Sequence, residues 1–163
     1  SQDALTGLLN RGAFVEAASA QLKTATLTDS DIGLLLFDLD RFKEVNDSHG
    51  HAAGDAVLVA FAEILRRSLR QTDVIGRIGG EEFAALLTGV DARRASLIAE
   101  GIRLEFARRS IDHSGTVIAT TVSVGLTIAP ARETSLTSLM ERTDGALYRA
   151  KRGRRDRVET APA

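Results

Sequence analysis

Apolar residues recur along the chain at two spacings, one typical of helices and one typical of strands. Helical spacing, at every third or fourth position, predicts amphipathic helices over residues 11–23, 56–69, 92–108 and 136–151. Asn10 stands directly before the first of these, where its side chain can cap the helix. Continuous or alternating apolar runs predict strands over residues 32–37, 74–78, 83–87 and 117–129, and Pro130 ends the last one.

Two of the intervening stretches are polar. Residues 43–55 are punctuated by Gly50 and Gly54, so we expect a short helix there at most. Residues 79–82, Gly-Gly-Glu-Glu, separate two apolar runs and predict the tip of a β-hairpin. Helices and strands that alternate in this way predict a mixed sheet with helices packed on it, in an α/β architecture.

Composition agrees with one globular domain. The chain has 163 residues, of which 44% are hydrophobic and 26% charged. The absence of Cys excludes a disulfide framework and a thiolate zinc site, and it fits a reducing compartment. No apolar run approaches the length of a membrane span. A formal net charge of -1 argues against binding of nucleic acid through overall charge. Because the chain begins Ser1-Gln2, without Met, we expect a domain excised from a longer protein.

Carboxylates follow two of the predicted strands. Asp38 and Asp40 come at the carboxyl end of the first strand, where open α/β sheets bind ligands, although strand termination and helix capping also favour Asp. Glu81 lies on the hairpin tip beside two glycines, whose backbone can approach an anion closely. If Asp38 and Glu81 converge, they form a hard oxygen site for Mg²⁺, which suggests phosphoryl or nucleotidyl transfer. The alternative is a solvated hairpin.

The tip reads Gly-Gly-Glu-Glu-Phe over residues 79–83 and resembles the motif of the GGDEF family, the diguanylate cyclases. Four further motifs are similar to this family in order and spacing. They are Asp-Ala-Leu-Thr-Gly-Leu-Leu-Asn-Arg at 3–11, Phe-Asp-Leu-Asp-Arg-Phe-Lys at 37–43, the stretch 46–55, and Ala-Leu-Tyr-Arg-Ala-Lys at 146–151. The resemblance covers residues 3–158, and an ensemble of this kind is far more specific than a lone glycine pair.

The resemblance implies a fold and a reaction. The fold is a mixed central sheet flanked by helices, like nucleotide cyclases and polymerase palms, with a ferredoxin-like core. The reaction condenses two GTP into cyclic di-GMP with release of two pyrophosphates, with Mg²⁺ or alternatively Mn²⁺ as cofactor. Each domain would bind one GTP, so catalysis would require a two-fold homodimer. The resemblance further implies a single domain over residues 1–163, a cytoplasmic location, and an upstream sensory domain in a parent protein that could itself be membrane-anchored.

The resemblance also assigns catalytic and metal-binding roles. Asp38, the main-chain carbonyl of Leu39 and Glu81 would bind the metal. Glu81 would also accept the proton of the attacking 3′-hydroxyl. Lys43 would stabilise charge on the triphosphate in the transition state.

Nucleotide contacts are implied at further positions. Asn46 and Asp55 would hydrogen-bond guanine, whose N–H edge suits a carboxylate in a way that adenine does not. The remaining implied substrate contacts are His51, Gly79, Gly80, Lys151 and Arg155. The family's closing motif has the form Ala-Lys-x-x-Gly-Arg-Asn, whereas residues 150–156 read Ala-Lys-Arg-Gly-Arg-Arg-Asp, which makes Arg155 a weaker assignment than Lys151.

Arg70 and Asp73 form an Arg-x-x-Asp sequence before the hairpin. Taken alone, they predict an exposed ion pair at a helix end. The resemblance implies instead an inhibitory site for cyclic di-GMP, where Arg can stack on guanine and bind phosphate.

Other functions are weighed against the cyclase. A catalytically inactive sensor that binds GTP or cyclic di-GMP is the main alternative, but such domains usually lose the carboxylates retained here. A different nucleotide cyclase or polymerase palm fits Asn46 and Asp55 less well. His49 and His51 lack further ligands for zinc. The basic segment 149–157 lacks the interleaved aromatic residues of a nucleic-acid site. For the chain as a whole we expect neither nucleic acid nor a membrane as a partner.

Overall fold

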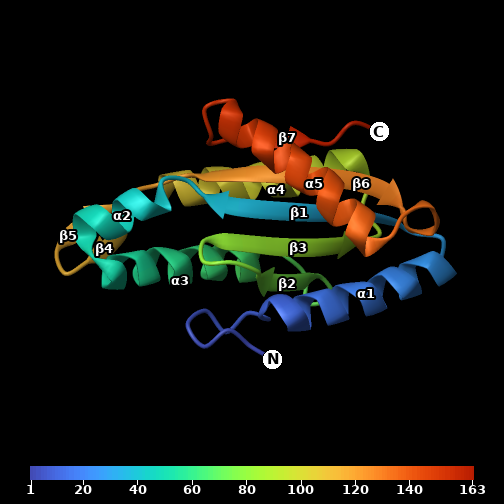
Figure 1. Cartoon of the computed structure of the whole chain (residues 1–163), viewed down its shortest axis with the longest axis horizontal. Helices are drawn as coiled ribbons and strands as arrows, with labels where there is room; N and C mark the ends of the chain where they lie inside the picture. Colours follow the sequence, from blue (N-terminus) through green and yellow to red (C-terminus); the bar gives the residue numbers. More distant parts are fainter.

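A five-stranded sheet forms the centre of the computed structural model, which describes all residues 1–163 (Figure 1). The strand order is β2-β3-β1-β6-β7, with β1 in the middle. Only β6 and β7 pair in parallel; the other neighbours are antiparallel. The strands are β1 (Asp31–Leu39), β2 (Val74–Arg77), β3 (Glu82–Thr88), β6 (Val122–Pro130) and β7 (Val158–Thr160).

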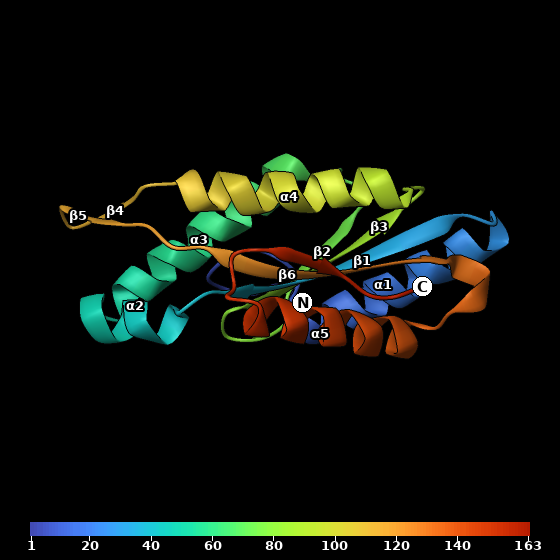
Figure 2. The same cartoon turned by 90° about the horizontal axis from the view of Figure 1, so that it is seen from above.

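Helices cover both faces of this sheet (Figure 2). One layer contains α3 (His51–Ser68) and α4 (Ala92–Arg108), and the other contains α1 (Arg11–Leu27) and α5 (Leu136–Arg152). Residues of β1 alternate between two apolar clusters, with Leu35 and Phe37 in the α3–α4 layer and Leu34 and Leu36 in the other. Burial on both faces explains why β1 is a continuous apolar run, and the predicted fold class is confirmed.

Aromatic packing fixes the first layer against the end of β1. The ring of Phe61 on α3 contacts those of Phe37, Phe83 and Phe106, with centroids 5.0–5.3 Å apart in edge-on or tilted geometry. Such pairs add to the stabilisation from burial alone. Phe37 directly precedes Asp38 at the end of β1, and Phe83 directly follows the hairpin tip. The aromatic cluster therefore holds the end of β1 in register with the start of β3.

Helix termini largely follow their caps. The Asn10 side chain accepts a hydrogen bond from the backbone of Ala13, as the sequence predicts, and Asp91 and Ser135 cap α4 and α5 in the same way. Helix α1 extends to Leu27, four residues beyond its last predicted position.

Two predictions of secondary structure are wrong in detail, and two short strands were not predicted. The stretch 43–55 is mostly helical: α2 (Phe42–His49) ends at Gly50, whose φ of 93° turns the chain, and α3 starts at His51 rather than residue 56. The strand expected over 117–129 is interrupted. Its start forms β5 (Thr116–Ile118), which pairs with β4 (Ile111–His113) in a separate two-stranded sheet. Strand β7 was not predicted, and a single turn of 3-10 helix, η1 (Ala131–Glu133), follows Pro130.

Candidate active site

Asp38, at the carboxyl end of the central strand, and the hairpin tip lie next to each other at one end of the sheet. Asp38 lies opposite Glu82 in the register of β1 and β3, and the backbone N–H of Leu39 donates to the carbonyl oxygen of Glu81 at 3.1 Å. Burial, followed by the negative charge of Asp38, raises the pKa of Glu82. The ends of β1 and β3, which are distant in sequence, therefore place the carboxylates of Asp38 and Glu82 on neighbouring strands.

Lys151 links the end of α5 to the same end of the central strand. Its Nζ donates to Oδ2 of Asp38 at 2.6 Å, and the Asp38 side chain is only 8% exposed. Burial raises the pKa of Asp38, although the hydrogen bond and charge of Lys151 act in the opposite direction. A buried carboxylate that faces a second carboxylate and has one cationic partner suits further positive charge.

The donor set fits a divalent cation of the hard class. The side chains of Asp38 and Glu81 and the carbonyl of Leu39 supply only oxygen atoms, which Mg²⁺ prefers. No group of three or more His, Asp or Glu side chains is placed to hold a metal ion. A metal site with the predicted ligands would therefore need the main-chain carbonyl in addition to the two carboxylates.

The residues predicted to contact guanine, Asn46 and Asp55, and the further substrate contact His51 lie around the turn between α2 and α3. Asn46 lies on α2, whereas His51 and Asp55 are exposed on the first turns of α3. The Oδ1 atom of Asn46 is buried and accepts no hydrogen bond within the protein. A Cβ atom at Gly54 would overlap this oxygen, so the absence of a side chain there allows the amide its position.

Lys43 forms its ion pair on α2 and not with Asp38 or the hairpin tip. Its side chain is 89% exposed, and Nζ donates to Oδ2 of Asp47 at 2.9 Å, one helical turn further along α2. The hydrogen bond that Lys43 donates to Asp47 raises the pKa of Lys43, which keeps the ammonium charged.

Arg77 holds the hairpin tip and is a residue that the sequence analysis missed. Its Nε and Nη2 donate to the carbonyl oxygen of Gly80 at 3.1 and 2.8 Å, and its Nη1 lies 3.2 Å from both carboxylate oxygens of Asp3. At Gly79, a Cβ atom would lie 2.5 Å from Oε1 of Glu82. The position of Arg77 two residues before the glycine pair was the available signal.

Arg70 and Asp73 lie at the opposite end of β3 from the tip. The carboxylate of Asp73 accepts from Arg70 N at 2.8 Å and from Arg70 Nη2 at 3.1 Å, while Nη2 also donates to the carbonyl of Thr88 at 2.6 Å. Asp73 is buried, whereas the Arg70 side chain is 55% exposed. The expected local ion pair is present, and the guanidinium remains accessible.

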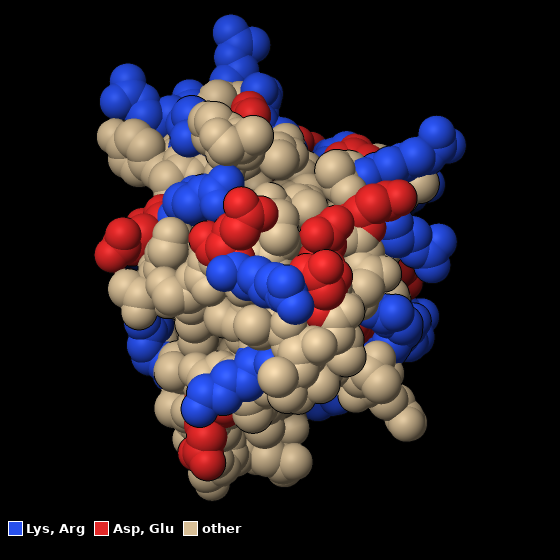
Figure 3. All heavy atoms as spheres, turned by 90° about the vertical axis from the view of Figure 1, so that its right-hand side faces the viewer, with Lys and Arg blue, Asp and Glu red and all other residues tan.

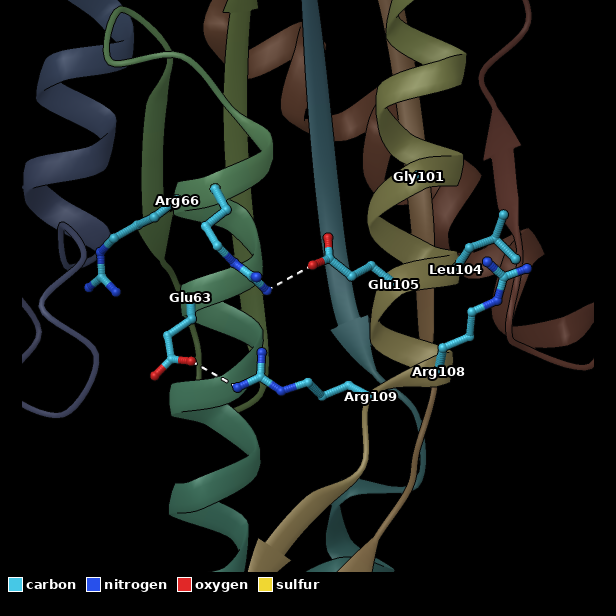
Figure 4. Close-up of a pocket in the computed structure, with 8 residues that line it drawn as sticks. Glu63, Arg66, Gly101, Leu104, Glu105, Arg108 and Arg109 are labelled. Atoms are coloured by element: carbon cyan, nitrogen blue, oxygen red, sulfur yellow. Dashed lines mark hydrogen bonds and ion pairs between the residues drawn. The ribbon is translucent and has the colours of Figure 1, made fainter.

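The largest hollow lies elsewhere, between α3 and α4 (Figure 4). It has a volume of about 990 Å³, and two ion pairs bridge it: Arg67 with Glu105 at 2.7 Å and Arg109 with Glu63 at 2.9 Å. These pairs neutralise two of the four arginines that line the hollow, and Arg66 and Arg108 form no ion pair there. Acidic and basic side chains are likewise intermixed on the face shown in Figure 3.

The fold and the paired carboxylates define a cyclase palm-like domain, and comparison with known proteins identifies its family. The model of the family described as "Diguanylate cyclase, GGDEF domain" matches residues 1–157. The chain belongs to the GGDEF family.

Named relatives agree. The chain is 40% identical to diguanylate cyclase DgcP of Pseudomonas aeruginosa, over 98% of this chain and 24% of that protein. It is 43% identical to diguanylate cyclase DgcM of Escherichia coli K12, over 98% and 38%. The chain thus spans between about a quarter and two fifths of the length of these relatives.

Solved structures confirm the fold. The GGDEF domain of DgcB from Caulobacter crescentus, in complex with c-di-GMP, superimposes with a TM-score of 0.94 at 35% identity, over 99% of this chain and 96% of that chain. The GGDEF domain of TpbB from Pseudomonas aeruginosa gives 0.94 at 36% identity, over 99% and 95%. None of the helices has the length and apolar character required to cross a bilayer.

Proposed function

We propose that this domain is a diguanylate cyclase that condenses two GTP into cyclic di-GMP. The observation that carries the proposal is the convergence of Asp38, the Glu81–Glu82 tip and Lys151 at one sheet edge. In each half-reaction a 3′-hydroxyl oxygen bonds to the α-phosphorus of the other GTP, and the bond from that phosphorus to the bridging oxygen breaks. Pyrophosphate leaves, and Glu81 accepts the hydroxyl proton.

The site residues divide this work by position. Asp38, the Leu39 carbonyl and Glu81 would hold Mg²⁺ or Mn²⁺, which neutralises phosphate charge when bound. Lys151 and Arg155 would bind phosphates, and Gly79 and Gly80 would admit them to the backbone. Lys43 would stabilise transition-state charge.

Guanine selection belongs to the turn between α2 and α3. The buried, unpaired Oδ1 of Asn46 lacks a donor, which an N–H group of guanine would supply. Asp55 would accept the remaining N–H groups of the guanine edge, and His51 would add a further contact. Adenine has neither the N1–H nor the amino group at C2 and would leave acceptors of this edge unsatisfied.

Two domains are required, because one GTP attacks the other. We propose a two-fold homodimer whose sites face each other, in a longer cytoplasmic regulator that carries an upstream sensory domain and contains residues 1–163 as a single cyclase domain. The greater length of the relatives supports the longer parent. Dimerisation predicts that activity per domain rises with protein concentration.

Product inhibition is proposed at Arg70 and Asp73. The exposed guanidinium of Arg70 can stack on guanine and bind phosphate. We expect Arg70→Ala to raise the inhibitory concentration of cyclic di-GMP by about tenfold or more, which corresponds to about 1.4 kcal/mol. Arg67→Ala is the control, and equal inhibition of the two variants would refute the site.

The reaction is tested by incubating the purified domain with GTP and Mg²⁺ and identifying products by mass spectrometry. Glu81→Gln should abolish cyclic di-GMP formation and retain the urea unfolding curve, whereas Glu16→Gln, on the exposed face of α1, should keep wild-type activity. Unchanged turnover in Glu81→Gln would refute the assigned role. Binding of GTP without any product, across a range of protein concentrations, would favour the sensor alternative.

A further inference from the structure

The segment after α5, residues 153–157, has an unusual backbone and is termed the closing loop. Arg154, Arg155 and Asp156 have φ values of 79°, 61° and 43°, so three consecutive residues other than glycine adopt the left-handed conformation. Residues with a side chain rarely do so, and such a run persists only where surrounding contacts hold it. The contacts that hold this loop therefore decide where Arg155 lies.

Asp40 holds the closing loop from the sheet. Its side chain is buried, and its carboxylate accepts hydrogen bonds from Thr121 Oγ1 and Ser123 Oγ, each at 2.7 Å. The third donor is the backbone N–H of Asp156 at 3.0 Å. A carboxylate with three donors is a fixed anchor, and it directly follows the strand that carries Asp38.

Arg103 contacts the closing loop from α4, which lies on the other face of the sheet from α5. It lies on α4, and its Nη1 donates to Oδ1 of Asp156 at 2.6 Å. Its Nε is 3.1 Å from both oxygens of Glu100, one turn earlier on the helix, which fixes the guanidinium. The Arg103 side chain is 16% exposed, so this ion pair is shielded from water more than the pairs that bridge the hollow.

Arg155 is fixed between these contacts. Its backbone N–H donates to the carbonyl of Ala150 at 3.0 Å, next to Lys151, and its carbonyl accepts from Arg157 Nε at 3.2 Å. The positive charge of Arg155 also reaches Asp38, where it acts to lower the pKa of that carboxyl against the larger effect of burial.

We infer that Arg103 and Asp40 are positioning residues for Arg155: by fixing Asp156 from two sides, they present the Arg155 guanidinium to the phosphates of the substrate. The inference rests on the proposed function. Position 156, which holds Asp where the usual closing motif has Asn, supplies the side-chain acceptor for Arg103.

A double-mutant cycle tests the inference. Arg103→Met should raise KM for GTP about tenfold with little change in kcat, because it loosens a group that binds phosphate. In an Arg155→Ala background the same substitution should have no further effect on KM, since the positioned group is absent. Additive effects of the two substitutions would overturn the inference.

Two controls separate positioning from general loss of structure. Arg67→Met removes the ion pair between Arg67 on α3 and Glu105 on α4, which does not contact the closing loop. This substitution should leave the KM for GTP unchanged. Asp156→Asn keeps both the backbone N–H for Asp40 and an acceptor for Arg103, so it should retain most of the affinity that Asp156→Ala loses. Equal KM values for these two variants would contradict the assigned contact.

Failure of the inference is distinguishable from failure of the proposed function. A wild-type domain that forms no cyclic di-GMP under any condition refutes the function. An active wild type whose KM is unaffected by Arg103→Met, with the urea midpoint of that variant recorded, refutes the positioning role alone.

Discussion

Lys151 Nζ and Asp38 Oδ2 lie 2.6 Å apart, although 113 residues separate them in the chain. The contact joins the last turn of α5 to the end of the central strand. It places a cation beside the deeply buried carboxylate at the candidate metal site, and it joins the motif at 146–151 to the motif at 37–43.

Substitution Asp38→Asn should stabilise the metal-free domain at neutral pH and abolish its activity. Burial raises the pKa of Asp38 in the folded state. The stability that this group contributes is therefore complete below the unfolded pKa of 3.8 and is lost as pH rises through the folded value. Urea unfolding should give a higher free energy for Asp38→Asn at pH 7.5 and none of that gain at pH 3, while cyclic di-GMP synthesis falls by about 100-fold or more.

Asp31→Asn, at the exposed start of the same strand, is the matched control for this measurement. It should change neither the stability nor the activity. A lower free energy of unfolding for Asp38→Asn than for wild type at pH 7.5 would contradict the assigned cost of burial.

Substitution Gly54→Ala should weaken GTP binding. The added Cβ would overlap Oδ1 of Asn46 and lie 3.1 Å from Cζ of Phe42, so the Asn46 amide must shift. Loss of one hydrogen bond worth about 1 kcal/mol predicts a KM for GTP raised about five- to tenfold. Gly101→Ala, which meets no atom within 4 Å, should keep KM and stabilise α4 by up to about 1 kcal/mol. Identical KM values in the two variants would argue against a role for Gly54.

Substitution Arg154→Gly should stabilise the domain. Arg154 has a φ of 79°, which costs a residue with a side chain roughly 1–2 kcal/mol, partly offset by the greater freedom of glycine in the unfolded chain. We expect a net gain of about 0.5–1 kcal/mol, measured as an increase in the urea midpoint. Arg152→Gly, in the last turn of α5, should lower the midpoint instead. A loss of stability in Arg154→Gly would show that the side chain supplies more than the strain costs.

Substitution Asp3→Asn should make the free energy of unfolding depend less on pH in the acidic range. Burial acts to raise the pKa of Asp3, but hydrogen bonds from Thr6 and Arg77 outweigh it and lower the pKa below 3.8. The contribution is thus present above pH 3.8 and is lost as pH falls through the lower folded value. At pH 7, Asp3→Asn should cost about 1 kcal/mol, and the difference should vanish in strong acid.

The exposed pair of Asp29 and Arg132 provides the comparison, since the two side chains are 71% and 62% exposed. Asp29→Asn should cost no more than about 0.5 kcal/mol at any pH, because solvent screens such pairs. Equal losses of unfolding free energy in Asp3→Asn and Asp29→Asn would show that the partly buried contact stabilises the domain no more than the exposed pair.

The elements with strong periodicity were predictable from the sequence. The run that became β1 is apolar at nearly every position because helices cover both faces of the sheet, and the buried side of α4 repeats at helical spacing. The split of residues 117–129 was not predictable, because β-branched and hydroxyl-bearing residues continue through β5, the residues after it and the start of β6. Strand β7 has only three residues, and its pairing with β6 depends on tertiary contact alone.

The candidate site shows the same division. Local motifs indicated Asp38, Glu81 and the glycine pair, and the antiparallel register of β1 and β3 sets Asp38 opposite Glu82, the residue that follows Glu81. Arg103 was missed because nothing near it in the sequence refers to Asp156, 53 residues away. Contacts between separate layers follow from packing, which periodicity does not encode.

Both outer strands of the sheet are short, with four residues in β2 and three in β7. Leu9 already bridges to Gly76 on the β2 side, so little unpaired backbone remains for a further strand there. Short, occupied edges discourage continuation of a sheet from one molecule into the next. Two such domains would therefore be expected to meet through side chains and the nucleotides they hold, in an arrangement that can form and separate without disturbing either fold.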